Sequence, residues 1–152
     1  MVDHILKTHQ IHPQDGQVPS PDWFESSETL HGLRKNKKFP TIWCAGCGIG
    51  IVMGSLIRAI DHLKLDHNKV ALVSGIGCTA RMPVYMDFNT LHTTHGRALA
   101  FATGLKVARP DLNVITIMGD GDALAIGGNH FIHAARRNIG ITAIVVNNAI
   151  YG

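Results

Sequence analysis

Three short apolar runs alternate with longer segments of helical periodicity, and this alternation constrains the fold more than any other feature. The runs cover residues 70–74, 114–118 and 141–146. Because each run is apolar nearly throughout, it predicts a strand buried on both faces. Strands of this kind separated by helices predict an α/β domain, with a parallel sheet flanked by helices.

Three segments have apolar residues at intervals of three and four, which predicts helices: 49–65, 96–109 and 128–138. Residues 1–38 are polar and lack a period, so they predict an extended N-terminal arm, with a short helix around 21–33. We expect one domain over 39–152, because 152 residues suffice for one hydrophobic core. The chain ends directly after the last predicted strand, so we expect this domain to be incomplete at its C-terminal end.

The net charge of +3 is too small to indicate nucleic acid or a membrane surface as a partner, and the basic cluster at 34–38 predicts a solvated segment. No stretch has the length of a transmembrane helix, and the N-terminal residues lack a secretory apolar core. We therefore expect a cytoplasmic protein. Its three cysteines then predict ligands or packing residues rather than disulfides.

Glycines and polar residues follow each predicted strand: Gly75 and Cys78, then Gly119, Asp120 and Gly121, and finally Asn148. Ligands of open parallel sheets bind at these carboxyl ends. A carboxylate between two glycines suits a phosphate site only when a divalent cation separates the two charges, and Mg²⁺ takes carboxylate, amide and carbonyl oxygens. Asp120 and Asn148, 28 positions apart, therefore predict a Mg²⁺-diphosphate site.

This motif resembles that of thiamine-diphosphate enzymes, in which Gly-Asp-Gly precedes a helix and an Asn-Asn pair. The resemblance implies the thiamine-diphosphate-binding fold, with Asp120, Asn148 and the backbone carbonyl of Ile150 as Mg²⁺ ligands. Residues 122–130 resemble, more narrowly, the cofactor-lining stretch of 2-oxoacid:ferredoxin oxidoreductases. The residues implied to contact the cofactor are Gly75, Cys78, His95, Gly119, Asp120, Gly121, Asp122 and Asn148.

Cys44 and Cys47 form a Cys-x-x-Cys pair before a predicted helix, and Cys78 lies 31 positions later. A redox dithiol would use only the pair, a zinc site would need His92 or His95 as a fourth ligand, and a cubane cluster needs four thiolates. A buried packing role also suits Cys78. The spacing alone does not separate these interpretations.

The motif Trp-Cys-Ala-Gly-Cys-Gly at 43–48, with Cys78 after the next strand, is similar to the β subunits of the same oxidoreductase family. The resemblance implies that Cys44, Cys47 and Cys78 bind a [4Fe–4S] cluster whose fourth ligand lies beyond the sequence given. Residues 82–92 look most like β subunits that act on 2-oxoglutarate.

The reaction that the resemblance implies is the oxidative decarboxylation of 2-oxoglutarate with coenzyme A, which gives an acyl-CoA, CO₂ and reduced ferredoxin. Pyruvate and broad 2-oxoacid enzymes share the larger motifs and remain alternatives. The family's activating glutamate comes from an α subunit, so we expect no catalytic acid or base in this chain and activity only with that partner. Outside the family, a non-redox thiamine-diphosphate decarboxylase or synthase, or a non-catalytic zinc-binding interaction domain, would use only one of the two sites.

Other polar residues have less specific roles. His95 lies in a loop implied to approach the cofactor, and His92 belongs either to that site or to the solvent-facing surface. Arg81 is a candidate for binding the substrate carboxylate, with a plain surface position as the alternative. His130 and His133 predict packing against the sheet rather than a metal site.

Overall fold

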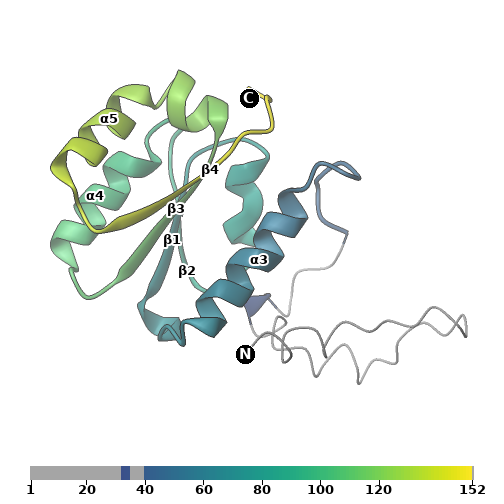
Figure 1. Cartoon of the computed structure of the whole chain (residues 1–152), viewed down its shortest axis with the longest axis horizontal. Coiled ribbons are helices and arrows are strands. Elements are labelled where there is room, and N and C mark those ends of the chain that lie inside the picture. The colour runs from purple at the N-terminus through teal and green to yellow at the C-terminus, as the bar shows by residue number, and fades with distance from the viewer. Residues whose placement is uncertain (1–31, 35–39, 152) are drawn as a thin grey trace, which may run out of the picture.

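Four strands form one parallel sheet within residues 32–34 and 40–151, the part of the chain that the computed structural model describes. The strands are β1 (Val70–Ser74), β2 (Asn89–His92), β3 (Asn113–Gly119) and β4 (Ile141–Val146). Their spatial order is β2-β1-β3-β4, and every neighbouring pair is parallel (Figure 1). The three apolar runs are therefore strands of a parallel sheet, as predicted.

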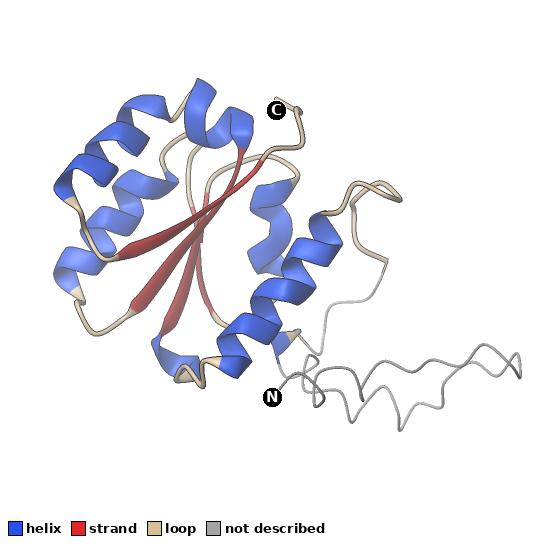
Figure 2. Cartoon of the chain, in the orientation of Figure 1, coloured by secondary structure: helices blue, strands red, loops and turns tan. Residues whose placement is uncertain are grey.

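Helices cover both faces of the sheet (Figures 1 and 2). One face packs against α3 (Ile49–His62), and the other against α4 (Ala98–Ala108) and α5 (Gly128–Arg137). Along β1, Val70 and Leu72 pack in the cluster with α3, whereas Ala71 and Val73 pack in the cluster with α4. Each fully buried aliphatic side chain of this kind contributes about 1.5–3 kcal/mol, so both faces of the central strands stabilise the fold.

The three predicted helices are present, with slightly shorter bounds. α3 ends at His62, where the chain turns and Lys64 adopts a positive φ of 50°. α4 ends at Ala108, before Pro110 would break it. After α5, Asn138 takes the left-handed conformation common at helix ends, with φ of 49°. None of the helices in the described ranges combines the length and apolarity needed to cross a membrane.

Two strands differ from what the apolar pattern indicates. The pattern does not predict β2, because all four of its residues are exposed. For β4 the predicted burial on both faces is wrong, since each of its residues is at least partly exposed. The physical reason is that β3 is the one neighbouring strand of β4 in the described part of the chain.

Only residues 32–34 of the predicted N-terminal arm are described, and 21–31, the rest of its possible helix, lie outside the described residues. Leu33 forms an isolated antiparallel bridge with Met86. The backbone N–H of Asp87 donates to the carbonyl of Gly32 at 2.8 Å on one side of that bridge. This short piece therefore packs against the turn that precedes β2.

Candidate cofactor site

The register of the sheet brings the segments that follow its strands to one edge. Ser74 at the end of β1 pairs with Ile117 of β3, and Gly119 at the end of β3 pairs with Val146 of β4. Because all four strands are parallel, the predicted site residues after β1, β3 and β4 lie at the same carboxyl edge.

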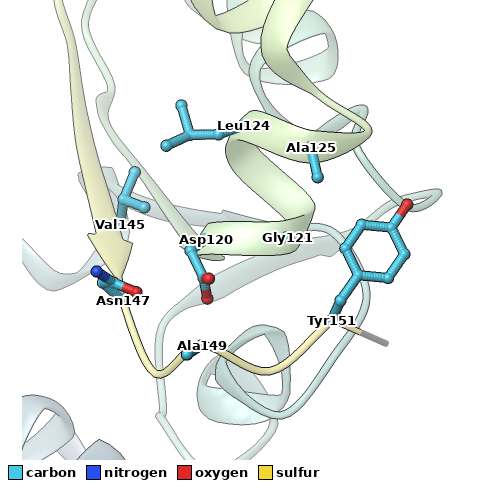
Figure 3. A pocket seen from close by; sticks show the side chains of 8 residues that line it. All are labelled: Asp120, Gly121, Leu124, Ala125, Val145, Asn147, Ala149 and Tyr151. Atoms are coloured by element: carbon cyan, nitrogen blue, oxygen red, sulfur yellow. The ribbon is translucent and has the colours of Figure 1, made fainter.

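A cavity of about 410 Å³ opens at this edge, between the short π-helical turn η4 (Gly121–Ala125) and the chain after β4. Its walls are formed by Asp120, Gly121, Leu124, Ala125, Val145, Asn147, Ala149 and Tyr151. Figure 3 shows the carboxylate of Asp120 and the amide of Asn147 pointing toward the same space. Leu124, Ala125 and Val145 add apolar walls, which strengthen the electrostatic attraction of any ion held by Asp120.

Buried polar atoms without a partner concentrate at this edge. In the described part of the chain they are Thr79 Oγ1, His95 Nε2, Thr116 Oγ1, Asp120 Oδ1 and Asp122 Oδ2. All but Thr116 follow the carboxyl end of a strand. A buried acceptor or donor that lacks a hydrogen bond costs about 1–3 kcal/mol, and such atoms are rare. Their concentration at one edge indicates that a polar ligand binds there. Thr79 is a member of this group that the sequence motifs did not single out.

The oxygen ligands available around Asp120 fit a Mg²⁺ ion bound together with a diphosphate. Asp120 contributes one carboxylate, and no group of three or more His, Cys, Asp or Glu side chains within metal-binding reach occurs among the described residues. Mg²⁺ suits this sparse set, because it completes its shell with amide, carbonyl and phosphate oxygens. Gly121 keeps the backbone close to its neighbours, since a Cβ there would lie 2.7 Å from the ring of Tyr151.

The two other predicted Mg²⁺ ligands, Asn148 and Ile150, lie outside the cavity wall. The side-chain oxygen of Asn148 accepts a hydrogen bond from the N–H of Ile150 at 3.3 Å, in a turn where Ala149 has φ of 55°. The neighbouring Asn147 lines the cavity instead. Sequence pattern alone does not separate two adjacent asparagines, and the roles of Asn148 and Ile150 stay predictions.

Asp122 faces the protein rather than the cavity. Its carboxylate is 2% exposed, and its Oδ1 accepts hydrogen bonds from three donors of this chain. They are His95 Nδ1 at 2.5 Å, the N–H of Gly96 at 2.7 Å and the N–H of Ile76 at 3.3 Å. Gly75 leaves room for this carboxylate, because a Cβ at position 75 would lie 2.6 Å from Cγ of Asp122. Gly75 and Asp122 therefore have a structural relation that the motif did not reveal.

Three free, exposed thiols belong to Cys44, Cys47 and Cys78. The N–H of Cys47 donates to the carbonyl of Cys44 at 3.3 Å in the turn before α3, and Trp43 Nε1 donates to the carbonyl of Cys78 at 2.7 Å. These thiols have the donor chemistry of an iron–sulfur site. However, the described residues bring no three such side chains close enough to share one metal ion, so the cluster stays a prediction.

Two of the open interpretations of the cysteines lose support. Cys78 is exposed, so a buried packing role for it is wrong. A zinc site that joins these cysteines to His92 or His95 also loses support, because the described residues include no group of three or more His, Cys, Asp or Glu side chains that could hold a metal ion. His92 Nδ1 lies 2.8 Å from the hydroxyl of Ser74, and His95 Nδ1 contacts Asp122.

The remaining candidates lie away from the cavity wall. Arg81 is exposed on the 3-10 helix η3 (Thr79–Val84), which follows Cys78. His130 and His133 line a groove of about 160 Å³ together with residues of α4. They therefore face α4, whereas the sequence pattern predicted that they pack against the sheet.

Comparison with known families agrees with this geometry. Residues 75–152 match the family described as thiamine pyrophosphate enzyme, C-terminal TPP binding domain, where thiamine pyrophosphate is thiamine diphosphate. The chain therefore belongs to the thiamine-diphosphate enzymes, and the α/β fold that its motifs implied is confirmed. Membership of this family favours a cofactor site at Asp120 over a non-catalytic zinc-binding domain.

Individual relatives narrow the class. The chain is 62% identical over 118 residues to the 2-oxoglutarate synthase subunit KorB of Archaeoglobus fulgidus, in an alignment that covers 78% of this chain and 44% of that protein. It is 49% identical over 110 residues to the 2-oxoglutarate oxidoreductase subunit KorB of Mycobacterium tuberculosis, covering 72% of this chain and 30% of that protein.

A solved structure is similar in fold as well as in sequence. It is the 2-oxoglutarate:ferredoxin oxidoreductase from Magnetococcus marinus with 2-oxoglutarate, coenzyme A and succinyl-CoA bound. The TM-score is 0.77 at 44% identity, over 84% of this chain and 43% of that one. The resemblance to 2-oxoacid:ferredoxin oxidoreductase β subunits, and to those acting on 2-oxoglutarate, is thereby confirmed. The chain spans at most about 44% of the length of these relatives.

Proposed function

We propose that the chain provides the thiamine-diphosphate-binding part of the β subunit of a 2-oxoacid:ferredoxin oxidoreductase. The proposed substrates are 2-oxoglutarate and coenzyme A, and the products are an acyl-CoA, CO₂ and reduced ferredoxin. The names of the curated relatives and the ligands of the Magnetococcus marinus enzyme support this choice of substrates. A reducing cytoplasm is the compartment that suits three free thiols.

The buried Oδ1 of Asp120 carries the proposal. It has no hydrogen-bond partner in the described part of the chain. The cavity beside it is also lined by the amide side chain of Asn147, which follows the neighbouring strand β4. We assign Asp120, Asn148 and the carbonyl of Ile150 to Mg²⁺, which neutralises the diphosphate of the cofactor. Thiamine diphosphate, when bound, supplies the electron sink that decarboxylation of a 2-oxoacid requires.

The residues of this chain bind and orient the cofactor, and Asp120, which lines the cavity, is assigned to the cation. The proposed α partner would supply the activating glutamate. We assign Arg81 to the substrate carboxylate, because it is a cation on η3, which begins at the carboxyl end of β1. Cys44, Cys47 and Cys78 are assigned to a [4Fe–4S] cluster, which would supply one-electron transfer to ferredoxin, with its fourth ligand from outside these 152 residues.

The test is anaerobic reduction of a viologen dye by the subunit that carries this sequence, assembled with its α partner and supplied with coenzyme A. We expect reduction with 2-oxoglutarate that is lost on Asp120→Ala, together with Mg²⁺-dependent binding of thiamine diphosphate. Asp111→Ala is the matched control, because Asp111 is an exposed carboxylate far from the cavity wall.

The same assay separates the alternatives. Faster reduction with pyruvate, or equal rates with several 2-oxoacids, would replace 2-oxoglutarate as the substrate. Decarboxylation without dye reduction, in protein that holds both thiamine diphosphate and iron, would indicate a non-redox thiamine-diphosphate enzyme and contradict the proposal.

A further inference from the structure

The carboxylate of Asp122 joins three separate segments of the chain. It stands on η4, and its partners come from the segment after β1 (Ile76) and from the loop before α4 (His95 and Gly96). A carboxylate buried this deeply is stable only when donors satisfy it. All three donors converge on Oδ1, so the other oxygen, Oδ2, takes no part in these bonds.

Two glycines, Gly75 and Gly96, permit this arrangement of hydrogen bonds. A Cβ on Gly75 would overlap the carboxylate of Asp122. Gly96 has φ of 71°, which places its N–H toward Asp122 Oδ1, and a Cβ there would lie 2.9 Å from the backbone nitrogen of Gly127. The position of the carboxylate therefore depends on residues far apart in sequence.

The contact with Asp122 fixes the ring of His95. Because Asp122 Oδ1 is an acceptor, Nδ1 of His95 is the donor in their 2.5 Å hydrogen bond. The opposite ring nitrogen, Nε2, is buried and has no partner in the described ranges. The ring of His95 lies 5.8 Å from that of Tyr151, which forms part of the Asp120 cavity wall. His95 thus lies beside a residue of the cavity wall.

We propose that Asp122 is a positioning residue, which holds His95 so that Nε2 binds an anionic phosphate oxygen of the cofactor. Asp122 itself would not touch the cofactor, in contrast to what the motif implied. A histidine ring that donates Nδ1–H to Asp122 and Nε2–H to an anionic oxygen has a suitable acceptor at each ring nitrogen. This inference rests on the proposed function, because it takes the diphosphate as the ligand.

A double-mutant cycle separates positioning from a general structural role. Binding of thiamine diphosphate with Mg²⁺ is measured by calorimetry on the assembled subunit. We expect Asp122→Leu to weaken binding about tenfold or more, the scale of a lost hydrogen bond to a charged group. In a His95→Ala background the same change should weaken it less than about twofold. Asp122→Asn, which keeps an accepting oxygen, should restore most of the affinity, and Asp111→Leu is the surface control.

The ring nitrogens of His95 give a readout that needs no cofactor. In protein labelled with ¹⁵N-histidine, we expect a proton on Nδ1 of His95 in the wild type and its loss in Asp122→Leu. If Asp122→Leu does not fold, Gly75→Ala serves in its place, because the added methyl group displaces the carboxylate and leaves both side chains intact.

Additive effects of Asp122→Leu and His95→Ala on affinity, or an Nδ1 proton that persists in Asp122→Leu, would overturn the positioning role. Failure of the wild-type protein to bind thiamine diphosphate would instead overturn the proposed function. It would also remove the phosphate as the ligand of His95 Nε2. The ¹⁵N spectrum then still decides whether Asp122 orients His95.

Discussion

The indole N–H of Trp43 donates a 2.7 Å hydrogen bond to the backbone carbonyl of Cys78. This bond links the Cys44–Cys47 turn to the third cysteine. The ring of Trp43 also packs edge-on against Tyr85 at 5.2 Å between centroids, and the Tyr85 hydroxyl accepts the N–H of Ile42 at 3.1 Å. The two cysteine segments are therefore held together by contacts that involve no thiol.

Trp43→Phe tests this link. The phenyl ring keeps the contact with Tyr85, while the hydrogen bond to Cys78 is lost, at a cost of about 1 kcal/mol. We expect less iron and sulfide per chain after anaerobic reconstitution, with the fold retained. Tyr85→Phe is the comparison variant, because it removes a hydroxyl bond to Ile42 and leaves the Cys78 carbonyl bonded. Equal iron content in wild type and Trp43→Phe would contradict the role of this bond.

Asp120→Asn should stabilise the protein without cofactor while weakening its binding of Mg²⁺ and thiamine diphosphate. The buried Oδ1 lacks a partner among the described residues, so the charged group is held at a cost to stability. We expect a gain of about 1 kcal/mol in the free energy of unfolding, measured by urea titration. Adding Mg²⁺ and thiamine diphosphate should reverse the order, since only the wild type then gains binding energy. A loss of stability in the cofactor-free variant would show that Asp120 is satisfied without a ligand.

Gly96→Ala and Gly104→Ala form a pair with opposite expected effects. At Gly96 a Cβ would approach Ile126 to 2.6 Å, and the positive φ of 71° adds strain, so we expect a loss of about 2 kcal/mol or more. Gly104 lies within α4 with nothing within 4 Å of an added Cβ, and alanine there should gain about 0.5–1 kcal/mol. Thermal unfolding of both variants checks the difference. A Gly96→Ala variant as stable as Gly104→Ala would contradict the close approach seen at this loop.

The exposed pair of Arg109 and Asp111 predicts a small pH effect. A side-chain hydrogen bond from the Arg109 guanidinium lowers the pKa of the Asp111 carboxyl, and the same bond raises the pKa of Arg109. Because the carboxyl pKa is lower in the folded state, its contribution is present above the ordinary pKa and is lost as the pH falls through the lowered one. The stability difference between wild type and Asp111→Asn should therefore shrink as the pH falls below the ordinary carboxyl pKa of 3.8. Both side chains are exposed, so the difference at neutral pH should be small. A difference that grew on acidification would contradict this sign.

The sequence predicts those strands whose burial can be read from their own residues. β1 and β3 are central strands, and their apolar runs match their burial almost residue by residue. β2 is not predictable in this way, because its four exposed residues become a strand only through pairing with β1. β4 is found as a strand, but its exposure depends on which strands lie beside it, and its own residues do not encode that.

The same distinction applies to the site. Asp120 is predictable because its immediate neighbours in the sequence, the two flanking glycines and the apolar strand before them, are sufficient to indicate a ligand site. The partners of Asp122 are not, since Ile76 and His95 lie 46 and 27 positions away in the chain. Thr79 was missed because a single hydroxyl at the start of η3 forms no pattern, and only its burial without a partner among the described residues marks it.

Adjacent asparagines after β4 give the last prediction. The motif assigns Mg²⁺ to Asn148, whose side-chain oxygen accepts the N–H of Ile150, whereas Asn147 lines the cavity. If Asn148 is the ligand, the turn at Ala149 must release that oxygen when the cation binds. Asn148→Ala should then weaken Mg²⁺-dependent binding of thiamine diphosphate by about tenfold or more, the effect of one lost oxygen ligand to a charged group, and Asn147→Ala should weaken it much less. Calorimetry at several Mg²⁺ concentrations separates the two variants, because loss of a metal ligand raises the Mg²⁺ requirement while loss of a wall contact does not. The reverse order of effects would assign the cation to Asn147, in the arrangement that the cavity already has.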